Sequence, residues 1–160
     1  CNPSEKKIGD GDILIIDTGS TLNGYYCDFD RNFGFGNINQ KSLDAYNKLW
    51  NATEKTLEII KPGISCKEVY ESLSKNLFSS NVKSSVGRMG HGFGLQLTEP
   101  PSIMIDDNTI LEKNMILALE PSIEIENDLM LVHEENILIT QNGNRLLTSR
   151  TPKELPVINV

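Results

Sequence analysis

The pattern of apolar and polar positions begins with two predicted strands. The stretch DILIID (12–17) is a short, continuous apolar run, which predicts an interior strand ending at Asp17. After the turn GSTLNG, the stretch YYCDFDRNFGFG (25–36) alternates well enough to be its antiparallel partner. Because side chains alternate along a strand, Asp28 and Asp30 of that partner share one face.

The middle of the chain has helical periodicity. Apolar residues recur every three or four positions from Ser42 to Lys61, and Pro62-Gly63 ends this first predicted helix. A second helix is predicted to begin at Ser65, with Glu68 in the register of a capping box. The chain then returns to strand-like runs separated by Asn, Asp and Gly turns: MILALEPSIEI, LMLVHEENILIT and NRLLT. This order predicts an α+β fold, with a mostly antiparallel sheet covered by helices.

Composition narrows the class of protein. With 160 residues and 38% hydrophobic content, we expect one domain over residues 1–160. The apolar runs are far shorter than the roughly 20 residues that cross a bilayer. A net charge of -7 disfavours nucleic acid and anionic membranes as partners. Three cysteines without a CxxC pair indicate a reducing, cytoplasmic location.

Four carboxylates interrupt otherwise apolar strand sequence. An unpaired charge buried there would cost several kcal/mol, on the order of a broken buried ion pair. Lysine and arginine are scarce in these runs, and the nearest are Arg31 and Arg88. We therefore expect bound cations to meet the four acids, which are Asp17, Asp28, Glu120 and Glu134.

Two divalent metal ions would neutralise four carboxylates. His91, in GHGFGLQLTEPPS (90–102), would then supply a nitrogen ligand, and its flanking glycines would let the backbone approach closely. Taken singly, each of these residues also fits a bland role as a turn former, a surface residue or the first exposed position after a strand. Their joint occurrence favours a metal site.

These motifs together resemble those of the pita-bread metallopeptidases, a family that includes methionine aminopeptidase, aminopeptidase P, prolidase and the metal-free creatinase. The resemblance runs from about Ile8 to Thr148. It rests on five blocks in the expected order: GDILIIDTGSTLNGYYCDFDRNF, IKPGISCKEVY, GHGFGLQLTEPPS, MILALEPSI and VHEENILITQNGNRLLT.

The resemblance implies a dinuclear metal site with five ligands. By similarity, Asp17 chelates one metal, while Asp28 and Glu134 bridge both. His91 and Glu120 complete the other metal, and we also expect these two residues to be catalytic. Creatinase lacks this ligand set, so its presence favours a metal enzyme.

The register of the strand NILIT, which follows, favours Glu134 over Glu135 as the last ligand. Two cations that share a water molecule lower its pKa and produce a bridging hydroxide that attacks an amide carbonyl. One metal stabilises the resulting oxyanion, and Glu120 passes the proton to the leaving nitrogen. Oxygen ligands with one imidazole suit Mn²⁺ or Co²⁺, and Zn²⁺ and Fe²⁺ also match this ligand type.

The resemblance implies a hydrolase of amide C–N bonds, of the Xaa-Pro aminopeptidase or dipeptidase type. Peptidases of the family carry a second histidine seven residues after the ligand, where this chain has Thr98. Thr98 is therefore the expected substrate-binding residue, and its identity leaves open a small, non-peptide amide substrate, as in ectoine hydrolase. A third alternative, from another class, is a non-catalytic pita-bread binding domain.

Three neighbours of the expected ligands have weaker signals. Asp30 either orients a ligand, pairs with Arg31 or is structural. His133 is predicted to point to the face opposite Glu134 and to pack there, and Cys27 is predicted to be a small buried residue.

The first predicted strand follows the start of the chain almost at once. We therefore expect the N-terminal part of the fold to lie outside this chain, and that part to supply one wall of the active site. By the same resemblance, we expect a homodimer in the full-length protein, with a small peptide or amide as substrate.

Overall fold

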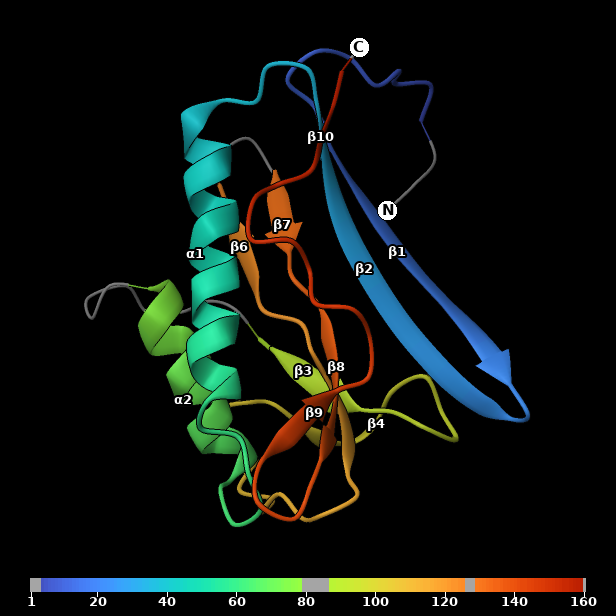
Figure 1. Cartoon of the computed structure of the whole chain (residues 1–160), viewed down its shortest axis with the longest axis vertical. Coiled ribbons are helices and arrows are strands. Elements are labelled where there is room, and N and C mark those ends of the chain that lie inside the picture. Colours follow the sequence, from blue (N-terminus) through green and yellow to red (C-terminus); the bar gives the residue numbers. More distant parts are fainter. Residues whose placement is uncertain (1–3, 79–86, 126–128, 160) are drawn as a thin grey trace.

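The computed structural model describes residues 4–78, 87–125 and 129–159. Within these residues, two strands are followed by two helices and then by eight short strands (Figure 1). The elements are β1 (Ile13–Leu22), β2 (Tyr25–Phe35), α1 (Gln40–Leu57), α2 (Cys66–Leu77), β3 (Gly90–Gly92), β4 (Glu99–Ser102), β5 (Ile116–Leu119), β6 (Ser122–Glu124), β7 (Met130–Val132), β8 (Glu135–Ile139), β9 (Asn144–Leu146) and β10 (Val157–Ile158). The predicted α+β fold is confirmed.

Strands β1 and β2 form a long antiparallel hairpin that turns at Asn23-Gly24, where both residues have a positive φ. The prediction that the first strand ends at Asp17 is wrong, because β1 continues to Leu22. Its second half is exposed, so ladder hydrogen bonds rather than burial maintain it, and an apolar run cannot reveal such an extension. The strand is also outermost in its described sheet, whose order is β1-β2-β10, rather than interior.

Each helix begins at a residue whose side chain caps its first turn. Asn39 caps α1 by accepting a hydrogen bond from the backbone N–H of Ser42, and Ser65 with Glu68 forms the predicted capping box of α2. Helix α1 ends at Leu57, one turn before the predicted Lys61. Neither described helix combines the length and the apolar character needed to cross a membrane.

The five-stranded sheet has the order β4-β3-β5-β8-β9, and all its pairs are antiparallel. Helices α1 and α2 lie on one side of it, and the β1–β2 hairpin lies on the other side (Figure 1). Only β10 pairs in parallel, with β2, among the described strands. The core fills the space under the helices with fully buried side chains that include Tyr46, Leu49, Leu73 and Ile137.

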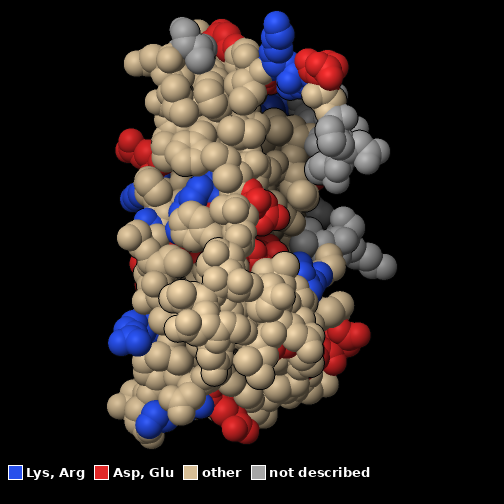
Figure 2. Space-filling model, turned by 90° about the vertical axis from the view of Figure 1, so that its right-hand side faces the viewer, with Lys and Arg blue, Asp and Glu red and all other residues tan. Residues whose placement is uncertain are grey.

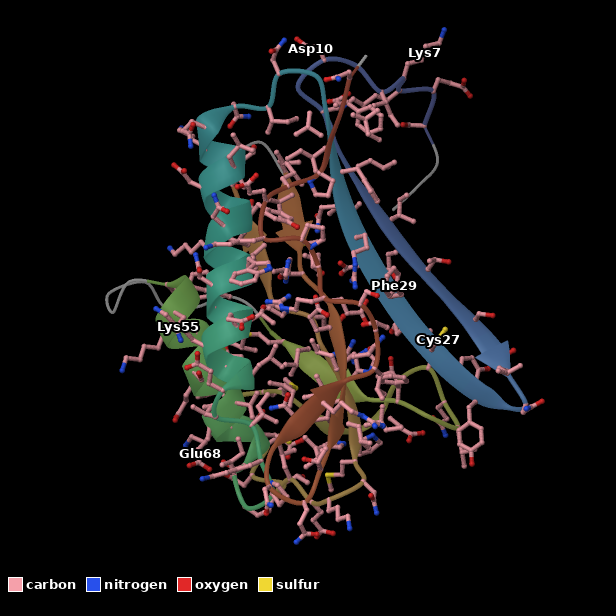
Figure 3. The ribbon with its side chains drawn as sticks, viewed as in Figure 1. Lys7, Asp10, Cys27, Phe29, Lys55 and Glu68 are labelled. Atoms are coloured by element: carbon pink, nitrogen blue, oxygen red, sulfur yellow. The ribbon has the colours of Figure 1, made fainter. Side chains whose placement is uncertain are left out.

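The side of the molecule on which the hairpin lies is largely uncharged (Figure 2). Large apolar side chains of this hairpin are exposed, namely Ile16, Leu22, Tyr25 and Tyr26. Cys27 is exposed as well, toward the tip of β2 (Figure 3), so the prediction of a buried cysteine is wrong. Alternation correctly assigns Cys27 to the face opposite Asp28, but it does not say whether that face is covered.

Candidate metal centre

One half of the candidate site lies on the β1–β2 hairpin. The ladder pairs Asp17 with Asp30 and Gly19 with Asp28. Because directly opposed residues of an antiparallel pair point to the same face, and because residues two apart on a strand share a face, these three carboxylates lie together. Asp17 is exposed, Asp28 is half-buried and Asp30 is buried.

The other half comes from the five-stranded sheet. His91 on β3 is opposite Ala118 of β5. Strands β5 and β8 pair Leu119 with Glu135, and the same register continues into β6 and β7. Glu120 and Glu134, which fall between these ladders, therefore stand opposite each other and share the face of Ala118 and His91.

The imidazole of His91 joins the two halves. Its Nε2 atom is 3.5 Å from Asp28 Oδ2 and 3.7 Å from Glu120 Oε1. Its Nδ1 atom is 2.9 Å from the carbonyl oxygen of Gly92, which can only accept a hydrogen bond. In the neutral ring Nδ1 therefore carries the proton, and Nε2 presents its lone pair to the carboxylates, as in a metal ligand.

The glycines that flank His91 allow β3 to fit between its neighbours. A Cβ atom at Gly90 would collide with the carbonyl oxygen of Ala118 on β5. A Cβ atom at Gly92 would come within 2.5 Å of the carbonyl oxygen of Pro100 on β4. The close approach expected for these glycines is therefore required by backbone on both sides.

The carboxylates of the site oppose one another's ionisation. Burial raises the pKa of Glu134 to about 9, with further increases from Asp28 and Asp30. Burial also raises the pKa of Asp30 to about 7, with Asp17 adding to the effect. The pKa of Asp28 is raised by burial as well, although His91 opposes the shift. Ionising these groups together is costly unless cations are bound among them.

The arginines near the site compensate only part of the negative charge of these carboxylates. Arg88 pairs with Glu120, at 3.0 Å between Nη2 and Oε1. Arg31 donates instead to the backbone carbonyl oxygens of Asp30 and Glu134, at 2.6 and 2.9 Å. Buried carboxylate oxygens of Asp30 (Oδ1) and Glu134 (Oε1) have no hydrogen-bond partner among the described residues. These oxygens, together with Nε2 of His91, fit a site for divalent metal ions.

The expected ligands lie near one another, but their side chains are not arranged around a single point. Within residues 4–78, 87–125 and 129–159, no group of three or more His, Cys, Asp or Glu side chains has the spacing of a ready metal site. All five expected ligands nevertheless lie in one region, since Glu134 interacts with Asp17, Asp28 and Glu120, and His91 links Asp28 to Glu120.

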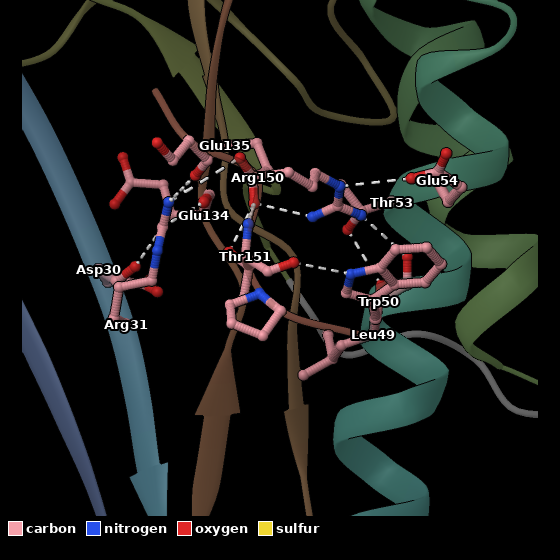
Figure 4. Close-up of polar contacts among 12 residues, drawn as sticks. Asp30, Arg31, Leu49, Trp50, Thr53, Glu54, Glu134, Glu135, Arg150 and Thr151 are labelled. Atoms are coloured by element: carbon pink, nitrogen blue, oxygen red, sulfur yellow. Dashed lines mark hydrogen bonds and ion pairs between the residues drawn. The ribbon is translucent and has the colours of Figure 1, made fainter. Parts of the chain in front are cut away.

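The adjacent glutamates Glu134 and Glu135 have different surroundings (Figure 4). Oε1 of Glu135 accepts hydrogen bonds from Arg150 Nη1 at 2.7 Å and from the backbone N–H of Thr151 at 2.9 Å. The hydroxyl of Thr151 also donates to it, at 2.5 Å. Its Oε2 is 4.0 Å from Nη2 of Arg31. Oε2 of Glu135 has no described hydrogen-bond partner, but Oε1 is occupied by three protein donors, and this difference from Glu134 favours Glu134 as the metal ligand.

Two further residues hold the halves of the site together. Asn136 donates a hydrogen bond from Nδ2 to the carbonyl oxygen of Asp28. Arg31 bonds the backbones of Asp30 and Glu134 as described, and also that of Ser149 at 2.8 Å. These roles were not predicted from the sequence. The polar run EEN at the start of a buried strand is the signal that could have indicated the role of Asn136, whereas no local signal marks that of Arg31.

His133 has the packing role that alternation predicts. It is fully buried, and its ring lies edge-on to that of Tyr46, with the centroids 5.5 Å apart. Neither ring nitrogen has a hydrogen-bond partner among the residues that the structure describes. Burial lowers the pKa of His133 to about 3, and Arg150 and Arg31 contribute to this decrease.

Replacing His133 with Phe should change the pH dependence of stability. The unfolded chain protonates this histidine near its ordinary pKa of 6.5, whereas the folded chain does so near 3. Wild-type stability from this group is therefore present above pH 6.5 and is lost as the pH falls toward 3. For the metal-free protein, we expect a change below about 1.5 kcal/mol at pH 7 and a relative gain for the variant at pH 4. Chemical denaturation at both pH values tests this, and parallel pH profiles would contradict it.

Thr98, the expected substrate-binding residue, is exposed in the loop between β3 and β4. This loop contacts the hairpin, because the backbone N–H of Tyr26 donates to the carbonyl oxygen of Gly94 at 2.8 Å. Its far end is held by a hydrogen bond from the backbone N–H of Gln96 to Glu99, at 3.1 Å.

Comparison with known proteins gives the class and then the family. A dipeptidase from Pyrococcus horikoshii superposes with a TM-score of 0.90 at 29% identity, over 98% of this chain and 44% of that one. Methionine aminopeptidase from Rickettsia prowazekii superposes with a TM-score of 0.80, over 92% of this chain and 68% of that one, and at 24% identity this is a likeness of fold. The class is that of the pita-bread fold.

The model of metallopeptidase family M24 matches residues 1–141. An Xaa-Pro dipeptidase of Pyrococcus horikoshii is 34% identical over 154 residues, which are 95% of this chain and 43% of that protein. The chain therefore belongs to metallopeptidase family M24. It spans less than half the length of this curated relative.

Proposed function

We propose that the protein is a dinuclear metal-dependent hydrolase of amide C–N bonds that acts on Xaa-Pro peptides. The observation that carries the proposal is the group of carboxylates facing Nε2 of His91, with buried oxygens of Glu134 and Asp30 that no described protein donor satisfies. Membership in family M24 and a relative named Xaa-Pro dipeptidase support it.

The proposed ligands are Asp17, Asp28, His91, Glu120 and Glu134. Divalent cations held there would polarise the scissile carbonyl and make a water molecule a better nucleophile near neutral pH. We propose Mn²⁺ as the metal, because oxygen ligands dominate the set. The fit rests on unsatisfied oxygens and on one imidazole that is oriented by the carbonyl oxygen of Gly92.

The side chains of the site divide the remaining tasks. Glu120 is half-buried and lies between His91 and Arg88, a place from which it can accept a proton from water and pass it to the leaving nitrogen. Arg88 holds Glu120 in that place through two contacts, at 3.0 and 3.1 Å. The Gly92 carbonyl keeps the His91 ring in one orientation.

A pocket of about 340 Å³ lies next to the end of β3, and its lining includes the second residue after His91. Its lining includes Phe93, Pro100 and Met115, and one carboxylate, Glu99. We propose that it receives an apolar part of the substrate, with Thr98 donating a hydrogen bond from the neighbouring loop. We also propose that the full-length protein is a cytoplasmic homodimer.

Turnover by the full-length, Mn²⁺-loaded protein tests the function. We expect release of proline from Xaa-Pro dipeptides or tripeptides and loss of this activity in Asp17→Asn, because one ligand is removed. Small cyclic and acyl-diamino amides belong in the same panel, since Thr98 replaces the usual histidine. Cleavage of these amides alone would contradict the peptidase assignment, and silence on all substrates despite bound metal would contradict hydrolysis.

A further inference from the structure

Asp30 is a buried carboxylate that the five-ligand set does not use. Its side chain is 4% exposed, and its Oδ1 atom has no hydrogen-bond partner among the described residues. It stands directly opposite Asp17 in the β1–β2 ladder and shares a face with Asp28, two residues earlier. An unsatisfied carboxylate oxygen is thus placed beside two of the proposed ligands.

The arginine next to Asp30 forms no described ion pair with it, although its charge opposes the rise in the pKa of Asp30. The guanidinium of Arg31 lies 3.9 Å from the centroid of the Phe29 ring. Its described hydrogen bonds go to backbone carbonyl oxygens, and its described ion pair is with Glu135. In the part of the chain that the structure describes, no ion pair or hydrogen bond joins the two side chains, so the pairing weighed from the sequence is not formed.

The neighbouring polar residue on the same face is also occupied elsewhere. Nδ2 of Asn32 donates to the carbonyl oxygen of Val132 at 2.6 Å. The structural carboxylate of Glu135 differs, because its Oε1 accepts three hydrogen bonds and its Oε2, although it also lacks a described hydrogen-bond partner, is 4.0 Å from Nη2 of Arg31. Apart from a backbone contact with Glu134, Asp30 has no described donor for Oδ1 and lies beside the carboxylates of Asp17 and Asp28, which is where a cation ligand would lie.

We propose that Asp30 is a further cation-binding carboxylate of the metal centre, acting alongside Asp17 and Asp28. This inference rests on the proposed function, since it assumes that divalent cations bind at this site. A sixth ligand raises the negative charge that faces the cations and uses an oxygen that is otherwise buried without a described partner. Loss of this carboxylate should weaken metal binding without weakening the fold.

Calorimetric titration of the metal-free, full-length protein with Mn²⁺ tests the proposal. We expect Asp30→Asn, which keeps the size and removes the charge, to raise the Kd for Mn²⁺ at least about tenfold. We expect the Tm of the metal-free variant to equal or exceed that of wild type, because a buried charge among like charges is removed. The matched control is Glu124→Gln, which removes an exposed carboxylate on β6 and should change neither value.

The outcomes separate the two proposals. If wild type binds Mn²⁺ and Asp30→Asn binds it equally well, the role of Asp30 is overturned while the metal centre stands. If Asp30→Asn fails to fold or has a lower metal-free Tm, Asp30 is structural and the proposal is overturned. If wild type binds no Mn²⁺, the metal centre itself is wrong, and the role of Asp30 falls with it. A changed electron paramagnetic resonance spectrum of Mn²⁺ bound to Asp30→Asn would support direct ligation.

Discussion

Replacing Glu134 with Gln is expected to remove bound metal and to lower kcat/KM for an Xaa-Pro substrate on the order of a thousandfold or more. Oε1 of Glu134 is buried and has no described protein donor, and four neighbouring carboxylates oppose ionisation of the side chain. A glutamine fills the same volume but cannot supply the negative charge that a metal ligand at this position would contribute. Metal content by mass spectrometry and steady-state kinetics on the same preparation measure both effects.

The matched control is again Glu124→Gln, which makes the same chemical change on the surface. It should retain metal and activity. The metal-free Glu134→Gln protein should be at least as stable to unfolding as metal-free wild type, because the substitution removes a group whose ionisation is suppressed by burial. Full metal content and near-normal turnover in Glu134→Gln would show that Glu134 is not a ligand.

Replacing Glu135 with Ala is expected to lower the free energy of unfolding by about 3–5 kcal/mol, the usual cost of breaking a buried ion pair from one side. Glu135 is fully buried and binds Arg150 and Thr151 through one oxygen (Figure 4). The same Arg150 lies over the ring of Trp50 on α1, 4.7 Å from its centroid, and Nε1 of Trp50 donates to the carbonyl oxygen of Thr151. Glu135 thus ties β8 to the C-terminal segment and to α1.

Urea denaturation of the metal-free protein measures this effect without a contribution from metal binding. Glu135→Gln is the matched variant, because its amide oxygen can still accept from Thr151 while the charge paired with Arg150 is lost. We expect its stability to lie between those of wild type and Glu135→Ala. A loss below about 1 kcal/mol in Glu135→Ala, within the range of an exposed pair, would contradict the structural role.

The two glutamates illustrate what a sequence can and cannot reveal. Periodicity and turn signals predicted the α+β order, both helices and the capping box, since these depend on local chemistry. The register of the following strand indicated Glu134 over Glu135, and the structure supports this choice by the partners that Glu135 has. Those partners, Arg150 and Thr151, are brought in by tertiary folding, so no local pattern marks them as neighbours.

The errors have the same origin. Strand β1 extends past Asp17 because it is hydrogen-bonded to β2, although its second half is exposed. Cys27 is exposed because nothing among the described residues covers its face of the hairpin, and alternation describes faces without describing what covers them. The role of Arg31 was missed because it contacts backbone atoms more than a hundred residues away in the chain.

The candidate site lies where the β1–β2 hairpin contacts the five-stranded sheet. The hairpin contributes three aspartates, the five-stranded sheet and its extension contribute His91 and two glutamates, and His91 lies between Asp28 and Glu120. Asn136 and Arg31 hold the two sheets in register at this point. Strands from two sheets can hold ligands from several chain segments at fixed separation, which is what the proposed dinuclear centre would need.

The central claim is that this site binds two divalent cations on which hydrolysis depends. Titration of the metal-free, full-length protein with Mn²⁺, with proline release from an Xaa-Pro dipeptide followed at each addition, tests it most directly. We predict two equivalents of Mn²⁺ per chain, activity that appears as they bind, and loss of that activity on chelation. Absence of Mn²⁺ binding, or proline release that persists after complete chelation, would contradict the claim.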